Sequence, residues 1–111
     1  MGTGSRSPKG NETLIGLEYE FAREQAYNLG RMGRKLEAAL AALAAFDAEQ
    51  PGGKAPVGKA RTHRAALVAA AGTALWHFVI QREACGLRDS RQIVRDYRVP
   101  AEVIARMGIV R

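Results

Sequence analysis

Residues 53–59 read GKAPVGK and have the spacing of a phosphate-binding loop, G-x-x-x-x-G-K. In such a loop the backbone amides surround a phosphate, the lysine reaches its terminal oxygens, and a following Ser or Thr holds magnesium. Ala60 follows the lysine here, so the hydroxyl group that would hold the metal is missing. No strand pattern precedes the segment, and linkers rich in Gly, Pro and Lys often contain this spacing. We therefore interpret 53–59 as a connection between two elements.

Other residue types that carry out catalysis are sparse. His63 and His77 would lie about 21 Å apart on one helix, which is too far to bind the same metal ion. Cys85 is the single cysteine, and no histidine is placed to activate its thiol. Because no nucleophile, base or ligand set can be assembled, we expect a protein that is not an enzyme and that has no cofactor and no metal.

Arginines recur near the C-terminus at three- to four-residue spacing and predict a basic stripe. Its members are Arg88, Arg91, Arg95 and Arg98, with Arg106 as an extension. Arginine can hold a phosphate through two hydrogen bonds, which would suit nucleic acid. Asp89 and Asp96 interrupt the positive charge, so a solvated face or an acidic protein partner suits the stripe better.

The segment 89–108 also has the apolar spacing of a helix-turn-helix motif. The expected buried positions are Ile93, Tyr97, Val99, Ile104 and Met107. Arg98 occupies the turn position that usually takes Gly, and Val94 stands where a small residue is usual. The second helix would expose Glu102, whose charge repels phosphates. A cap that packs on the rest of the protein is therefore favoured, and DNA binding through 89–108 is the alternative.

Charge is distributed unevenly over the 111 residues, which carry a net charge of +6. Residues 12–49 have 4 basic and 7 acidic side chains, whereas residues 50–111 have 11 basic and 4 acidic ones. The second half could therefore bind nucleic acid or an acidic partner. The acidic half of one chain could equally meet the basic half of another.

The composition and the hydrophobic pattern predict helices. Alanine, which has the highest helix propensity, accounts for 20 of the 111 residues. Residues 1–10 are rich in Gly, Ser and basic side chains and are expected to form a flexible tail. The remaining 11–111 are expected to form a single all-α domain. Its elements are a long helix at about 13–49, a Gly/Pro loop at 50–60, a second helix at about 61–85, and short helices at about 89–97 and 100–107.

These elements predict a long antiparallel helical hairpin with a cap of two short helices at the C-terminus. The first helix is about a dozen residues longer than the second, so the cap is expected to fold back over this extra length. Gly30 and Gly33 are places where the first helix could kink. The expected core residues are Leu36, Leu40, Leu43, Leu67, Leu75 and Phe78.

The second helix is apolar nearly all round from Ala66 to Ile80, and such a helix must be covered on more than one side. Trp76 and Ile80 point away from the first helix, and Gly72 and Ala69 nearby would let a second backbone approach. We therefore expect a homodimer in which two hairpins form a four-helix bundle through these four residues. The apolar run is shorter than the roughly 20 residues that cross a bilayer, so no membrane span is expected.

The stretches 21–47 and 81–108 together resemble a family of small, uncharacterised, all-helical bacterial proteins. The resemblance is carried by NLGRMGRKL in the first stretch and REACGLRD in the second. It implies an all-helical cytosolic protein, and it implies no activity.

Taken with the single cysteine and the lack of a signal peptide, these patterns favour a small cytoplasmic protein. The function that fits them best is a non-enzymatic protein-interaction or regulatory module.

Overall fold

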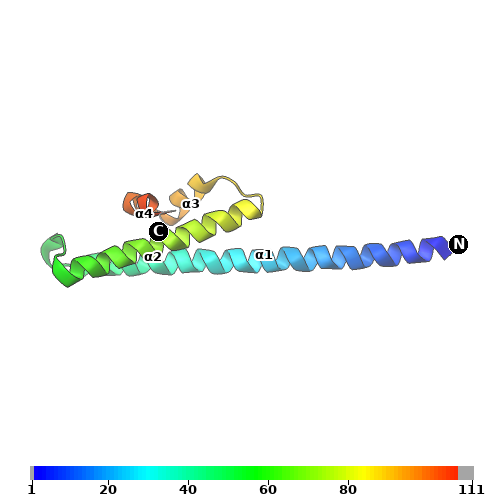
Figure 1. The fold of residues 1–111 in the computed structure, drawn as a ribbon, viewed down its shortest axis with the longest axis horizontal. Coiled ribbons are helices and arrows are strands. Elements are labelled where there is room, and N and C mark those ends of the chain that lie inside the picture. The colour runs from blue at the N-terminus through cyan, green and yellow to red at the C-terminus, as the bar shows by residue number, and fades with distance from the viewer. Residues whose placement is uncertain (1, 108–111) are drawn as a thin grey trace.

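The computed structural model describes the backbone of residues 2–107 and the side chains of residues 13–107. The elements are α1 (Gly2–Ala48), the short 3-10 turn η1 (Pro51–Gly53), α2 (Gly58–Ala84), α3 (Ser90–Tyr97) and α4 (Ala101–Arg106) (Figure 1). Residues 2–107 contain no strand. The all-α class is therefore confirmed. None of the helices in this part of the chain combines the length and the apolar character that a membrane crossing requires.

Helix α1 is longer than the sequence predicts. The structure differs from the expected flexible tail over 1–10, because the chain is helical from Gly2 onward. Once a helix has formed, each added residue contributes a backbone hydrogen bond, so the helix can extend beyond its packed part. Gly30 and Gly33 do not break it. Gly33 instead allows close packing, because a Cβ atom there would lie 2.7 Å from the Tyr97 hydroxyl and 3.4 Å from the Phe78 ring.

The expected antiparallel hairpin of α1 and α2 is confirmed. The chain reverses at η1, where Gly52 and Gly53 have φ values of +60° and +69°, a backbone region that favours glycine. Gly58 has φ +61° and opens α2, three residues earlier than expected. At this end of the hairpin Asp47 forms an ion pair with Arg64.

The two helices of the hairpin differ in length, and half of α1 is left alone. Gly33 lies beside Phe78, and α2 runs for six more residues to Ala84. Because the helices are antiparallel with the same rise per residue, α2 ends at the level of Tyr27 on α1. Residues 2–26, here called the overhang, extend beyond the hairpin (Figure 1), and the molecule measures 80 × 25 × 20 Å.

The core lies between α1, α2 and the two short helices. Its buried apolar residues are Leu36, Leu43, Val68, Ala71, Leu75, Phe78, Val79, Ile93, Val99 and Val103. Four of the six expected core residues belong to this set. Leu40 and Leu67 only pack partly buried against it.

The cap does not fold over the overhang, so that prediction is wrong. Helices α3 and α4 lie across the hairpin (Figure 1), and α4 packs on α2. Tyr97 at the end of α3 meets the Phe78 ring edge-on at 5.7 Å. Only five residues connect α2 to α3, and Gly86 reverses the chain there with φ +89°. The short connection directs the cap back along α2, which leaves the overhang uncovered.

Candidate interaction surfaces

The overhang carries a row of large apolar side chains that contact no other element. Leu14 is 56% exposed, Leu17 60% and Phe21 62%. We call these three residues the overhang stripe. Monomeric proteins rarely expose contiguous apolar patches of this kind unless a partner covers them. The stripe is therefore a candidate interaction surface.

The overhang stripe continues the apolar face that α2 covers. Steps of three or four residues keep a helical side chain on one face. Such steps lead from the stripe through Gln25 and Asn28 to Met32, Leu36, Ala39 and Leu43. Leu36 and Leu43 are buried in the core. The same face of α1 is thus apolar on both sides of Gln25 and Asn28. Its C-terminal half is covered by other helices, and its N-terminal half is exposed.

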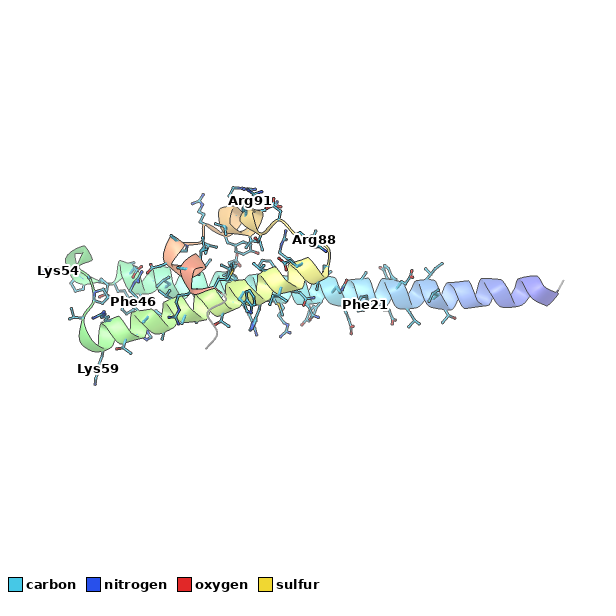
Figure 2. All side chains as sticks on the ribbon, turned by 45° about the horizontal axis from the view of Figure 1, so that its top comes forward. Phe21, Phe46, Lys54, Lys59, Arg88 and Arg91 are labelled. Carbon is cyan, nitrogen blue, oxygen red and sulfur yellow. The ribbon has the colours of Figure 1, made fainter. Side chains whose placement is uncertain are left out.

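A shallow groove of about 550 Å³ runs along the same part of α1. Its walls are Leu17, Phe21 and Tyr27, with Glu20, Arg23 and Glu24 beside them. On the other side of the overhang, Tyr19 is 65% exposed, and the Arg23 guanidinium lies 5.9 Å from its ring centroid. Figure 2 shows Phe21 on α1 beyond the end of the hairpin.

Only part of the predicted dimer interface on α2 is exposed and could contact a second chain. Gly72 is buried beneath α4, where a Cβ atom would lie 3.0 Å from the Cβ of Arg106. Its assignment to an intermolecular interface is therefore wrong, because the cap of the same chain occupies this position. Trp76 and Ala69 are half-buried, and Ile80 is 44% exposed. The large exposed apolar side chains gather on α1 instead of on α2.

The arginines of the predicted basic stripe lie in two places. Four of them are exposed and lie on α3 or next to it: Arg88, Arg91, Arg95 and Arg98. Figure 2 labels Arg88 and Arg91 at this place. Asp89 caps α3 by accepting a hydrogen bond from the Arg91 backbone at 3.2 Å. Arg98 ends α3 in the left-handed conformation, with φ +52°. Arg106 is separate from these four, because it lies on α4 against α2.

The geometry of α4 does not favour the helix-turn-helix interpretation. A recognition helix needs one face free to enter the major groove. The six-residue α4 has its Glu102 paired with Arg64 of α2, and its Arg106 backbone lies against Gly72. The outer side of α4 is exposed, and it presents the Glu102 carboxylate, whose charge repels phosphates.

Arg64 connects three helices through its guanidinium group. Its Nε and Nη2 donate to the two carboxylate oxygens of Asp47 at 2.8 and 3.0 Å. Its Nη1 and Nη2 donate to the two oxygens of Glu102 at 2.9 and 2.7 Å. These hydrogen bonds lower the pKa of both carboxyl groups and raise the pKa of Arg64. The sequence analysis missed this cluster, because its members lie 17 and 38 residues apart.

A cleft of about 730 Å³ lies beside this cluster, between the hairpin loop, the start of α2 and α4. Ala65, Val68 and Ala105 contribute apolar surface. Lys54, Arg61 and Arg106 line it together with the paired Arg64. The loop 53–56 forms one wall, so the glycine- and lysine-rich segment noted in the sequence does border a basic cleft. This segment lies between α1 and α2, so it connects two helices, as the sequence predicts.

The residues that could do metal or thiol chemistry lie apart from one another. His63 packs against the Phe46 ring at 5.4 Å, while His77 is exposed on α2. The half-buried Cys85 Sγ lies 3.9 Å from the Gln81 amide nitrogen. Among the residues that the structure describes, no three His, Cys, Asp or Glu side chains come together as a metal site would require.

Residues 6–111 match the model of one protein family, described as a family of unknown function (DUF6665). No curated protein and no solved structure matches the chain. The match agrees with the resemblance to a family of uncharacterised helical proteins.

Proposed function

Since the chain belongs to this family of unknown function, we propose from the geometry of its surfaces that it is a small non-enzymatic protein-interaction module. One observation carries the proposal. The apolar residues of α1 follow one face that is interrupted only by Gln25 and Asn28, yet only the C-terminal half of this face is covered within the described part of the chain. Leaving three large apolar side chains in water is unfavourable by about 25 cal/mol per Å² of exposed apolar surface, so a partner that covers them gains this free energy.

The overhang presents its stripe in a preformed helix. The hairpin holds the C-terminal half of α1 through Leu36 and Leu43, so the N-terminal half continues from a fixed base. A preformed helix with anchors three, four and seven residues apart fits another helix or an apolar groove. The proposed module binds through this face and needs no cofactor and no metal.

The arginines near α3 provide the proposed module with a second, polar surface. Arg88, Arg91, Arg95 and Arg98 are exposed and would suit an acidic protein surface. Nucleic acid is less favoured, because the exposed side of α4 carries the Glu102 carboxylate, whose charge repels phosphates. The single cysteine, Cys85, is compatible with a cytoplasmic location.

The proposal is tested by affinity capture from cells that naturally produce the protein. The tagged wild type is compared with Phe21→Glu, which puts a charge on the stripe, and with Tyr19→Glu, which puts it on the other side of the overhang. We expect protein partners, including untagged copies of the chain, to be retained by the wild type and Tyr19→Glu and lost from Phe21→Glu. Identical captured proteins for all three baits would contradict the proposal.

A further inference from the structure

We infer that the cleft between the hairpin loop, α2 and α4 binds a small phosphate monoester whose organic part is apolar. The phosphate group is held by Lys54, Arg61 and Arg106, and the organic part lies against the apolar surface of the cleft. The site goes beyond the proposed protein-interaction surfaces. It lies at the hairpin loop, away from the overhang stripe, so the two are tested separately.

The three cations of the cleft come from three segments of the chain. Lys54 belongs to the loop between α1 and α2, Arg61 to the first turn of α2, and Arg106 to the end of α4. All three side chains are exposed, and within residues 13–107 none of them forms an ion pair. Arginine can bind a phosphate through two parallel hydrogen bonds, so these cations suit an anion in the cleft.

Two carboxylates line the same cleft, and they do not cancel its positive charge. Asp47 and Glu102 each accept two hydrogen bonds from Arg64, so their oxygens already have a cationic partner. In total, four cations and two carboxylates line the cleft, which leaves a net charge of +2. A phosphate monoester carries nearly two negative charges at pH 7, whereas a carboxylate carries one. The charge of the cleft therefore matches the phosphate ester better.

The cleft also has an apolar surface, which a phosphate ion alone would leave in water. Val68 is buried at this surface, and Ala65 of α2 and Ala105 of α4 contribute to it from two helices. The volume of about 730 Å³ lies within the range of small-molecule sites and exceeds what a phosphate ion requires. The expected ligand therefore carries an apolar organic part next to its phosphate.

This mode of binding differs from that of a phosphate-binding loop. In such a loop the lysine at the end of the motif, here Lys59, would reach the phosphate. Lys59 does not belong to the described lining of the cleft, and in Figure 2 it points away from the hairpin loop. Lys54, at a variable position of the motif, lines the cleft instead. The two lysines therefore distinguish the two modes of binding.

Titration calorimetry on the full chain tests the site with phenyl phosphate, a phosphate monoester with an apolar ring. We expect saturable binding that is about tenfold or more tighter than that of inorganic phosphate, because the ring covers apolar surface. Benzoate has the ring but only one negative charge, so it should bind more weakly than phenyl phosphate. Phenyl phosphate should also raise the Tm, since a ligand that binds only the folded state stabilises it.

Substitutions of single cations locate the binding site. Lys54→Ala and Arg106→Ala should each weaken the binding of phenyl phosphate about fivefold or more, because each removes a charged hydrogen-bond donor. Arg106→Ala keeps the Cβ atom that lies against Gly72, so α4 retains this contact. Lys59→Ala and Arg95→Ala are the matched controls. They remove the same charges from exposed positions outside the cleft and should leave the affinity unchanged.

Three results would overturn the inference. The first is that phenyl phosphate shows no saturable binding at millimolar concentrations, and the second is that benzoate binds as tightly as phenyl phosphate. The third is that Lys59→Ala or Arg95→Ala weakens binding as much as Lys54→Ala, which would show a general attraction by the positive charge of the protein. Phe21→Glu, the stripe variant, should bind phenyl phosphate like the wild type, so a failure of the cleft leaves the proposed function standing.

Discussion

The Arg64 guanidinium donates two hydrogen bonds to the Glu102 carboxylate, at 2.9 and 2.7 Å, across 38 residues of sequence. This pair joins α4 to α2 at the end of the molecule opposite the overhang. The same guanidinium holds Asp47 at the end of α1. The three residues thus fasten the cap to both helices of the hairpin.

Breaking the Arg64–Glu102 pair, which joins α4 to α2, should lower the stability of the protein by a small but measurable amount. We expect Glu102→Gln to lower the free energy of unfolding by about 0.5–1 kcal/mol, because the pair is bidentate but partly exposed to water. Urea unfolding measures the change. Arg61→Ala, which removes a cation lining the neighbouring cleft, is the control and should change the stability by less. An equal loss of stability in both variants would contradict a specific contribution of the Arg64–Glu102 pair.

The same cluster should make the stability depend on pH. The ordinary pKa values are 3.8 for Asp47 and 4.5 for Glu102, and the hydrogen bonds from Arg64 lower both in the folded protein. The folded state then binds fewer protons than the unfolded chain in the acid range. The stabilisation is therefore complete above about pH 4.5 and is lost as the pH falls through the lowered pKa values.

A pH series of urea unfolding on the wild type and Glu102→Gln checks this prediction. The difference between them should be constant near neutral pH and should shrink below about pH 4.5. A difference that grows toward acid pH would contradict it.

Gly72→Ala should be destabilising although alanine is the better helix former. The new Cβ atom would lie 3.0 Å from the Cβ of Arg106 and 3.2 Å from its carbonyl carbon, so that α4 would have to move. Overpacking costs about 1–3 kcal/mol, which exceeds the gain of up to about 1 kcal/mol in helix propensity. Thermal unfolding measures the net effect.

Gly16→Ala is the matched control, since nothing lies within 4 Å of a Cβ atom there. It makes the same chemical change in a helix and should raise the helix content or leave the stability unaltered. If both variants are stabilised, α4 does not pack on Gly72 as described.

Replacing a core leucine with alanine should lower the stability more where the leucine is fully buried than where it is partly buried. We expect Leu36→Ala to cost about 2–5 kcal/mol, because Leu36 is completely buried between α1 and its neighbours. Leu40→Ala should cost clearly less, because Leu40 packs at the margin of the core. Equal costs, measured by urea unfolding, would contradict this placement.

The helices and their order could be predicted from the sequence, because the forces that form them are local. The alanine content and the apolar face with steps of three and four residues predict the two long helices. The turn at Pro51, Gly52 and Gly53 and the reversal at Gly86 follow from backbone preferences of single residues. The antiparallel hairpin follows because a short connection leaves two adjacent helices few other ways to pack.

Tertiary structure alone decided which faces meet. The apolar side of the cap could have covered either the overhang or α2, and periodicity does not distinguish these two surfaces. The short connection between α2 and α3 and the close approach of Arg106 to Gly72 place the cap on α2. That choice brings Glu102 to Arg64 and leaves Leu14, Leu17 and Phe21 exposed. Both results arise because segments that are far apart in the sequence compete for the same apolar surface. A local pattern of residues does not show which segment covers that surface.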